Sequence, residues 1–260
     1  MSSTELIEFG NAGEWDGPYE ISPCRRALSP SRLPGIDYAL NPYGGCEHGC
    51  VYCYAPEVTH SDWAGWRVVR VRSNICERLA LELRGVSGTI GVGTVTDPYQ
   101  GAERRFELTR GCLEAIAERG ARIHVHTKSD LVLRDIDLIS RMRGEVGVTV
   151  TTLDDRRSKI TEPGAPLPGR RLAAIRGLAD AGVDVYALVG PVLDALGGRE
   201  GELVDALAAA GARRVVTDDL NLRPGLAARL NRMGISGAPG AAERVRALAE
   251  ARGMRAERAF

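Results

Sequence analysis

The sequence predicts an α/β fold, a partial (βα)6 TIM-like barrel. The chain has 260 residues, a length that fits one barrel-like domain. Short apolar runs rich in β-branched residues recur along it, as in strands that are buried on both faces. Helical patterns separate these runs, and strands that alternate with helices form right-handed parallel units. The sheet then either curls into a partial barrel or stays open and doubly wound.

The N-terminal residues 1–35 are rich in Gly, Pro and Ser and lack periodicity, so we expect an irregular arm there. The barrel is expected over 36–234, with strands at 38–43, 89–97, 122–130, 145–155, 184–193 and 213–222. Helices are predicted at 74–85, 103–120, 130–144, 169–182 and 200–211, and each range ends at a glycine. An Arg/Ala-rich helix with a frayed tail is expected over 235–260. In either architecture the chemistry belongs at the carboxyl ends of the strands.

The composition excludes several classes of protein. Apolar residues make up 44% of the chain and charged residues 26%, which is typical of a globular protein. The sequence has neither a long apolar run nor a secretory signal, so we expect no membrane span and a cytoplasmic location. The 34 basic and 34 acidic side chains balance, and no overall field draws the protein to a polyanion. The arginines crowded into 67–84 indicate either a solvated face, which we favour, or a phosphate-contacting patch.

Three of the six cysteines, Cys46, Cys50 and Cys53, lie within the short stretch CEHGCVYC. Disulfide frameworks belong to short secreted chains, so a reduced metal site fits this pattern better. Thiolates are soft ligands that suit zinc or iron–sulfur clusters. A structural zinc would need a fourth ligand, for which His48 or His60 is available. The favoured alternative is a [4Fe-4S] cluster with one iron left open.

This stretch matches the pattern CxxxCxxC, with Tyr52 as the aromatic residue before the last cysteine, and it resembles the signature of radical S-adenosylmethionine (SAM) enzymes. The blocks ALNPYGGCEHGCVYCYAP, GTVTDPYQ, TKSDLVLRDIDL and VTVTTLDD, within residues 25–225, resemble the branch that contains spore photoproduct lyase and DNA repair photolyase-like proteins. The resemblance implies a barrel of the radical SAM type that binds a [4Fe-4S] cluster and SAM. It also implies reductive cleavage of SAM to a 5′-deoxyadenosyl radical, which abstracts hydrogen in a lyase-like or transferase reaction, and an electron donor such as ferredoxin or flavodoxin.

The resemblance further implies which residues contact SAM. Tyr52 is expected at the adenine, and Thr96 and Asp97 at the methionyl amino group, since a hydroxyl and a carboxylate can accept hydrogen bonds from an ammonium. Lys128, one of two lysines in the chain, and Thr151 match family positions that bond the cofactor. Other interpretations stay open: a buried aromatic for Tyr52, a turn-opening residue for Asp97 and a strand former for Thr151.

Other positions bear on the substrate. His124 and His126 alternate along one predicted strand and share a face, which either lines the barrel interior or, as we favour, packs outward under a helix. Spore photoproduct lyases carry a hydrogen-donating cysteine where this chain has Thr94, and a hydroxyl holds its hydrogen too tightly for that step. We expect Cys24, Cys76 and Cys112 to be packing residues. We therefore do not expect that lyase activity, and the substrate is a nucleic acid, a protein or a metabolite. The competing interpretation is a non-catalytic metal-binding module.

Overall fold

The computed structural model describes residues 5–7 and 19–259, and its centre is an eight-stranded sheet. Neighbouring strands follow the order β12-β11-β10-β9-β8-β7-β4-β3. All neighbours pair in parallel except β3, which is antiparallel to β4. Within the described chain the edge strands β3 and β12 do not pair with each other, so the barrel is open. The strands are β3 (Leu28–Pro30), β4 (Tyr38–Leu40), β7 (Thr89–Val92), β8 (Arg122–Thr127), β9 (Gly144–Thr149), β10 (Asp184–Val189), β11 (Arg214–Thr217) and β12 (Arg255–Arg258).

The partial barrel that the sequence predicts is confirmed, and each predicted strand begins a parallel βα unit. Most strands end earlier than predicted, because the polar residues after them leave the ladder and turn toward the site. Their apolar side chains are almost completely buried, including Ile90, Val125, Val148 and Val215. Burial of this apolar surface is the main term that stabilises such a core.

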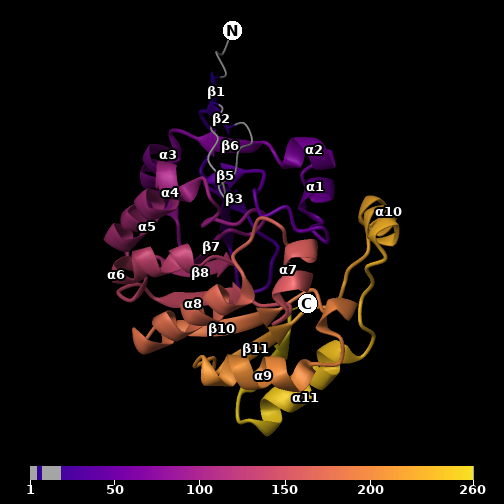
Figure 1. Ribbon diagram of the computed structural model, residues 1–260. Coiled ribbons are helices and arrows are strands. Elements are labelled where there is room, and N and C mark those ends of the chain that lie inside the picture. The colour runs from indigo at the N-terminus through magenta and orange to yellow at the C-terminus, as the bar shows by residue number, and fades with distance from the viewer. Residues whose placement is uncertain (1–4, 8–18, 260) are drawn as a thin grey trace.

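Helices cover the outer side of the main sheet, where Figure 1 shows α3, α5, α6, α8 and α9 following one another from top to bottom. Two predicted helices are broken: 103–120 divides at Glu107, which has φ 49°, and 130–144 becomes a 3-10 turn and one short helix. At the second break, the buried carboxylate of Asp135 accepts hydrogen bonds from Arg110 and Arg134. The helices are α3 (Ile75–Glu82), α4 (Glu103–Phe106), α5 (Leu108–Arg119), η2 (Asp130–Asp135), α6 (Ile136–Ile139), α8 (Pro168–Asp180), α9 (Glu200–Ala209) and α11 (Ala241–Ala251).

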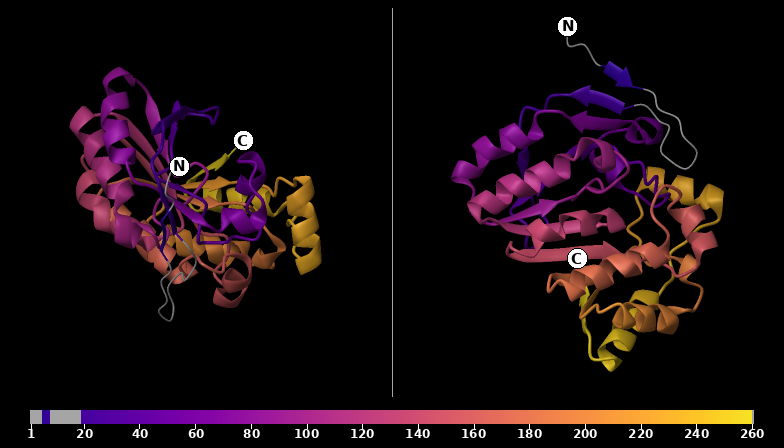
Figure 2. Two further views of the ribbon diagram at one scale, coloured as in Figure 1. Left: turned by 90° about the horizontal axis from the view of Figure 1, so that it is seen from above. Right: turned by 60° about the vertical axis from the view of Figure 1, so that its left-hand side comes forward.

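A second, four-stranded sheet lies at the N-terminal end of the molecule, above the barrel in the right-hand view of Figure 2. Its order is β1-β2-β6-β5, with β1 (Glu5–Ile7), β2 (Tyr19–Ser22), β6 (Val69–Arg72) and β5 (Tyr43–Gly44). The predicted irregular arm is therefore wrong for β1, β2 and β3, and residues 1–4 and 8–18 of it lie outside the described residues. Local sequence does not reveal these strands, because Tyr19 and Ile21 pair with Val69 and Val71, some fifty positions later.

The C-terminal segment contains the expected helix, but its tail is ordered. Residues Arg255–Arg258 form β12, which pairs in parallel with β11 and adds an edge to the main sheet. The frayed tail is wrong because β11 offers an unpaired backbone edge to these residues. The remaining helices are α1 (Ala55–Val58), α2 (Trp63–Trp66), η1 (Leu83–Gly85), α7 (Asp155–Thr161), η3 (Asp194–Leu196) and α10 (Pro224–Met233), the last standing at the right of Figure 1. In the described ranges, no helix has the length and apolar character that a membrane crossing requires.

Candidate active site

A cavity of about 460 Å³ lies along the inner side of the main sheet. Its wall contains Asp97, Lys128 and Pro191, which follow β7, β8 and β10, and also Glu145 and Arg214, near the beginnings of β9 and β11. The cavity therefore extends from the carboxyl ends of the strands, where the sequence places the chemistry, toward their amino ends. Pockets of this size and position are the usual sites of small-molecule binding in α/β proteins.

The predicted cluster ligands, Cys46, Cys50 and Cys53, all line this cavity. They lie in the loop that leaves β5, and Gly45 at its start has φ 78°. A Cβ there would come within 2.4 Å of the carbonyl oxygen of Val68, so only glycine fits. Burial raises the pKa of all three thiols, that of Cys50 to about 12. Thiols that bind a metal lose their protons as they do so.

Glu47, between the first two cysteines, fastens the loop to the turn that follows β7. Its carboxylate accepts hydrogen bonds from the Tyr19 hydroxyl and the Ala102 N–H, both at 2.8 Å. Its own N–H donates to Gln100 Oε1 at 2.9 Å. A Cβ at Gly101 would come within 2.0 Å of Glu47 Oε2, so glycine makes room for the carboxylate. Glu47 is not among the predicted site residues, and its one sequence signal is a carboxylate inside the cysteine motif.

A second attachment of the loop comes from α10. Arg229 donates from Nε to the Val51 carbonyl at 2.7 Å and from Nη2 to the Cys53 carbonyl at 2.6 Å. Its guanidinium lies 3.9 Å from the centre of the Trp63 ring, a cation–π contact that holds it in place. Arg229 thus fixes the backbone of the loop and places a positive charge beside Cys53. It is another residue that sequence reasoning misses, because it follows the motif by more than 170 positions.

Asp97 connects the cysteine loop to the end of β8. Its Oδ1 accepts from the Thr127 hydroxyl at 2.7 Å and from the Tyr99 N–H at 2.9 Å. Its Oδ2 accepts from the Lys128 N–H at 2.7 Å and lies 3.3 Å from His48 Nδ1. Each carboxylate oxygen therefore has two partners from the protein. A contact between Asp97 and a methionyl ammonium stays a prediction, and the structure adds a role for Asp97 in holding the site together.

Three more of the predicted cofactor residues, Tyr52, Thr96 and Lys128, line the cavity. The Thr96 hydroxyl donates to the Tyr43 carbonyl at 3.3 Å, so its lone pairs remain available as acceptors. The Lys128 Nζ lies 5.6 Å from the centre of the Tyr52 ring. The structure thus brings the ends of β7 and β8 together with the cysteine loop, as the sequence predicts.

Thr151 lies behind the cavity wall, and this position does not fit the predicted cofactor contact. Its buried hydroxyl donates to Glu162 at 3.2 Å, as the Tyr52 hydroxyl also does. Arg171 pairs with Glu162 at 2.5 Å, and although burial raises the pKa of this carboxyl, Arg171 and Lys128 outweigh it and hold the pKa below its usual value. The strand ends at Thr149, which does line the cavity, so Thr151 already belongs to the turn toward α7.

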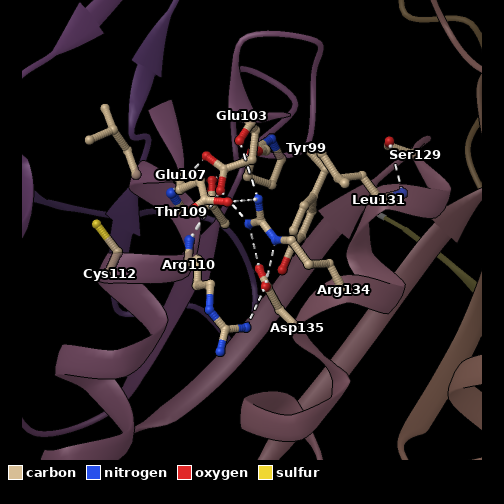
Figure 3. A network of polar contacts seen from close by, with 12 residues as sticks. Tyr99, Glu103, Glu107, Thr109, Arg110, Cys112, Ser129, Leu131, Arg134 and Asp135 are labelled. Carbon is tan, nitrogen blue, oxygen red and sulfur yellow. Dashed lines mark hydrogen bonds and ion pairs between the residues drawn. The ribbon is translucent and has the colours of Figure 1, made fainter. Parts of the chain in front are cut away.

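The turn after β7 is supported from outside the cavity by a charged network around Glu103 (Figure 3). Thr109 donates its hydroxyl to the Pro98 carbonyl at 2.5 Å and its N–H to Glu103 Oε2 at 2.8 Å. Arg134 donates from Nη2 to Glu103 Oε1 at 2.6 Å and from Nε to Asp135 Oδ1 at 2.8 Å. Both carboxylates are fully buried, so each depends on these partners. The network fixes the turn that carries Thr96 and Asp97.

His124 and His126 line the cavity, and the favoured prediction that they pack outward is wrong. On β8 the alternating residues Ile123 and Val125 are buried in the main hydrophobic core. Because successive side chains of a strand point to opposite faces, the histidines face the other way, into the barrel. Alternation in sequence shows which residues share a face, but it does not show which face meets the helices.

The alternative of a single zinc ion, with His48 or His60 as its fourth ligand, is disfavoured by the positions of these residues. His48 is buried in the cavity wall, whereas His60 is exposed on the surface. Among the described residues, no three His, Cys, Asp or Glu side chains are placed to hold one metal ion. A four-iron cluster binds its thiolates on different irons, farther apart than the ligands of a single zinc. Three soft thiols in one cavity therefore fit a four-iron cluster better than a single zinc ion. The other three cysteines, as predicted, pack in or against the main hydrophobic core: Cys24, Cys76 and Cys112.

Comparison with known proteins agrees with this geometry. Residues 40–196, more than half of the chain, match the family model of the radical SAM superfamily. An uncharacterised protein of Mycobacterium tuberculosis is 35% identical over 238 residues, covering 84% of this chain and 70% of its own length. One of Methanocaldococcus jannaschii is 33% identical over 175 residues, covering 65% and 66%. The chain thus spans about two thirds of the length of these relatives.

Solved structures share the fold. Spore photoproduct lyase complexed with dinucleoside spore photoproduct superposes with a TM-score of 0.69 at 18% identity, covering 93% of this chain and 82% of the lyase. SuiB of Streptococcus suis, bound to S-adenosylmethionine, superposes with a TM-score of 0.55 at 13% identity, covering 85% and 49%. The cysteine loop, the open barrel and the match over residues 40–196 lead to one conclusion. This chain belongs to the radical SAM superfamily of enzymes.

Proposed function

We propose that this protein holds a [4Fe-4S] cluster through Cys46, Cys50 and Cys53 and uses it to cleave bound SAM reductively, for hydrogen abstraction from a substrate. The observation that carries the proposal is that three thiols from one short loop line a single cavity. When bound, the cluster and SAM together supply a 5′-deoxyadenosyl radical. The electron would come from a small redox protein of the ferredoxin or flavodoxin class.

In this proposal the residues of the chain bind and orient SAM. Lys128 supplies a cation for the carboxylate or ribose oxygens of SAM, and Thr96 an acceptor for its ammonium. Tyr52 packs against the adenine, with its hydroxyl held by Glu162. Asp97 fixes the loop against β8 and shares its oxygens with the ammonium. Thr151, which was predicted to contact SAM, instead helps to hold Glu162.

The substrate is not the one that spore photoproduct lyase repairs, in our proposal, because Thr94 takes the place of a hydrogen-donating cysteine. Thr94 lines the cavity, and its hydroxyl accepts from Asn41 Nδ2 at 3.0 Å. The two structural neighbours hold different ligands: spore photoproduct lyase is complexed with a dinucleoside photoproduct, and SuiB has also been solved bound to a precursor peptide. Nucleic acid, protein and small metabolite therefore remain the candidate substrate classes.

Anaerobic reconstitution with iron and sulfide tests the proposal. We expect a broad brown absorbance that dithionite bleaches, and 5′-deoxyadenosine when SAM is added to the reduced protein. Cys50→Ser should lose both, whereas Cys24→Ser, a cysteine outside the cavity, should keep both. A colourless protein with a single zinc per chain would contradict the proposal and support the non-catalytic metal-binding module.

The role of Lys128 has its own test, because the chain offers a matched control. Lys128→Ala removes one cation from the cavity wall, and we expect SAM affinity to fall by on the order of tenfold or more, the usual cost of a lost charged hydrogen bond. Lys159→Ala removes the other lysine, which is exposed on α7, and should leave affinity unchanged. Equilibrium binding of SAM to the reconstituted protein measures both. Equal affinities in the two variants would exclude a contact between Lys128 and SAM.

A further inference from the structure

The amino-terminal end of the cavity contains a cluster of polar side chains from four neighbouring strands. We name it the His–Tyr cluster: His124 and His126 on β8, Glu145 on β9, Tyr186 on β10 and Arg214 on β11. All five line the cavity. His124 and His126 share the inner face of β8, and Lys128 follows the end of that strand, so the cluster lies deeper in the barrel than Lys128. A substrate that passes the cofactor end of the cavity would meet it.

The hydrogen-bond partners determine where the protons of this cluster lie. Glu145 is ion-paired with Arg214, and its Oε1 lies 3.3 Å from His124 Nδ1. A carboxylate attracts an N–H and repels a bare nitrogen lone pair, so this contact assigns the hydrogen of His124 to Nδ1. Burial lowers the pKa of His124, so the ring is neutral and its Nε2 is an acceptor. With this tautomer, the Tyr186 hydroxyl, 2.7 Å away, donates its one hydrogen to Nε2.

The same count of hydrogen-bond donors and acceptors applies to His126. The Tyr186 oxygen also lies 2.5 Å from His126 Nε2, and its single hydrogen is already used by His124, so His126 must donate from Nε2. Burial lowers the pKa of His126 to about 3, with His124 and Lys128 adding to the effect, so this ring carries only that one hydrogen. Its Nδ1 is therefore a bare acceptor. Within the described residues no hydrogen bond engages this atom, and the ring lines the cavity.

The charges around this acceptor are balanced. Arg214 pairs with Glu145, lies 3.9 Å from Glu257, and stacks 4.5 Å from the centre of the Tyr186 ring. Its charge is thus already offset by two carboxylates. The other cations of the described cavity wall lie toward the cofactor end: Lys128 follows β8, and Arg258, which ends β12, is paired with Asp219. The lone pair on His126 Nδ1 repels an anion and accepts from an N–H or O–H. The site selects by hydrogen bonding rather than by charge.

We propose that the His–Tyr cluster is a substrate subsite, in which His126 Nδ1 accepts a hydrogen bond from an uncharged donor of the substrate, an amide or imide N–H or a hydroxyl. The proposal rests on the proposed function, since it places the substrate beyond the cofactor in the same cavity. Tyr186 acts as a positioning residue, because its hydroxyl bridges the two imidazoles and fixes the tautomer of His126. One end of the substrate therefore carries an uncharged N–H or O–H donor.

Nitrogen-15 NMR of histidine-labelled, reconstituted protein with SAM tests this directly. The chain has four histidines, so the spectrum is simple, and His126→Gln identifies the signals of His126. We expect Nδ1 in the unprotonated range and Nε2 in the protonated range. Succinimide, which has an imide N–H, should shift the Nδ1 signal, and N-methylsuccinimide, the same ring without the N–H, should bind on the order of tenfold more weakly. Inorganic phosphate should cause no shift.

Two tyrosine variants separate the positioning role from a general structural one. Tyr186→Phe removes the bridging hydroxyl, so we expect His126 to show a mixture of tautomers and succinimide to bind more weakly. Tyr38→Phe, on β4 and outside the cavity wall, should change neither signal. The subsite is overturned if Nδ1 of His126 is protonated or if both imides shift its signal equally. It is also overturned if neither succinimide nor acetamide, a simple amide with an N–H, shifts that signal. Failure of the proposed function is seen separately, as wild-type protein that binds no iron or does not cleave SAM.

Discussion

The buried ion pair between Glu162 and Arg171 makes the sharpest prediction about stability. Both side chains are 0% exposed, and Arg171 Nη1 lies 2.5 Å from Glu162 Oε2. Glu162→Gln removes the negative charge and leaves the guanidinium without a counter-charge in the interior. Breaking a buried pair in this way costs about 3–5 kcal/mol, because the remaining ion has lost its solvation and its partner. For a chain of this size that corresponds to a fall in Tm of roughly 6–20 °C.

Thermal unfolding followed by circular dichroism measures this effect, with a matched control on the surface. Glu202→Gln breaks the pair with Arg199, whose side chains are 60% and 48% exposed, and we expect its free energy of unfolding to change by less than about 0.5 kcal/mol. Replacing both Glu162 and Arg171, as Glu162→Gln with Arg171→Met, should cost less than the sum of the two single changes. Equal melting temperatures for Glu162→Gln and Glu202→Gln would refute the reasoning.

The remaining predictions concern the loop, the pH and the thiols. Arg229→Gln removes the charge and one of the hydrogen bonds to the cysteine loop. The proposed cluster should then be lost faster and have a more negative reduction potential, measured by redox titration, with Arg229→Lys intermediate. The pKa of His126 is about 3 in the fold and about 6.5 when unfolded, so the unfolded chain binds the proton first. The contribution of His126 to stability should be constant above about pH 6.5 and fall below it by up to about 1.4 kcal/mol per pH unit, a slope that His126→Gln removes in urea unfolding. The Cys76 and Cys112 sulfurs lie 3.8 Å apart, so diamide should oxidise them to a disulfide, seen as loss of two thiols by mass spectrometry and prevented by Cys76→Ser.

The parts of this protein that sequence alone predicts are those encoded over short distances along the chain. The strands of the barrel follow from runs of apolar, β-branched residues, and burial of Ile90, Val125 and Val148 in one core confirms them. The cysteine loop is equally local, since its three thiols lie within eight positions. Thr96, Asp97 and Lys128 line one cavity because the carboxyl ends of parallel strands meet at one edge of the sheet, and their contacts with SAM stay a prediction.

Other features depend on contacts between distant segments, and only the tertiary structure decided them. The N-terminal strands exist because β2 finds β6, and Arg229 reaches the cysteine loop from α10. Thr151 faces Glu162 because β9 ends two residues before it. The alternation of His124 and His126 determined that they share a face, but which face covers the core depends on where the helices pack. A period along a strand is a local property of the backbone, whereas the direction of its inner face is set by the rest of the fold.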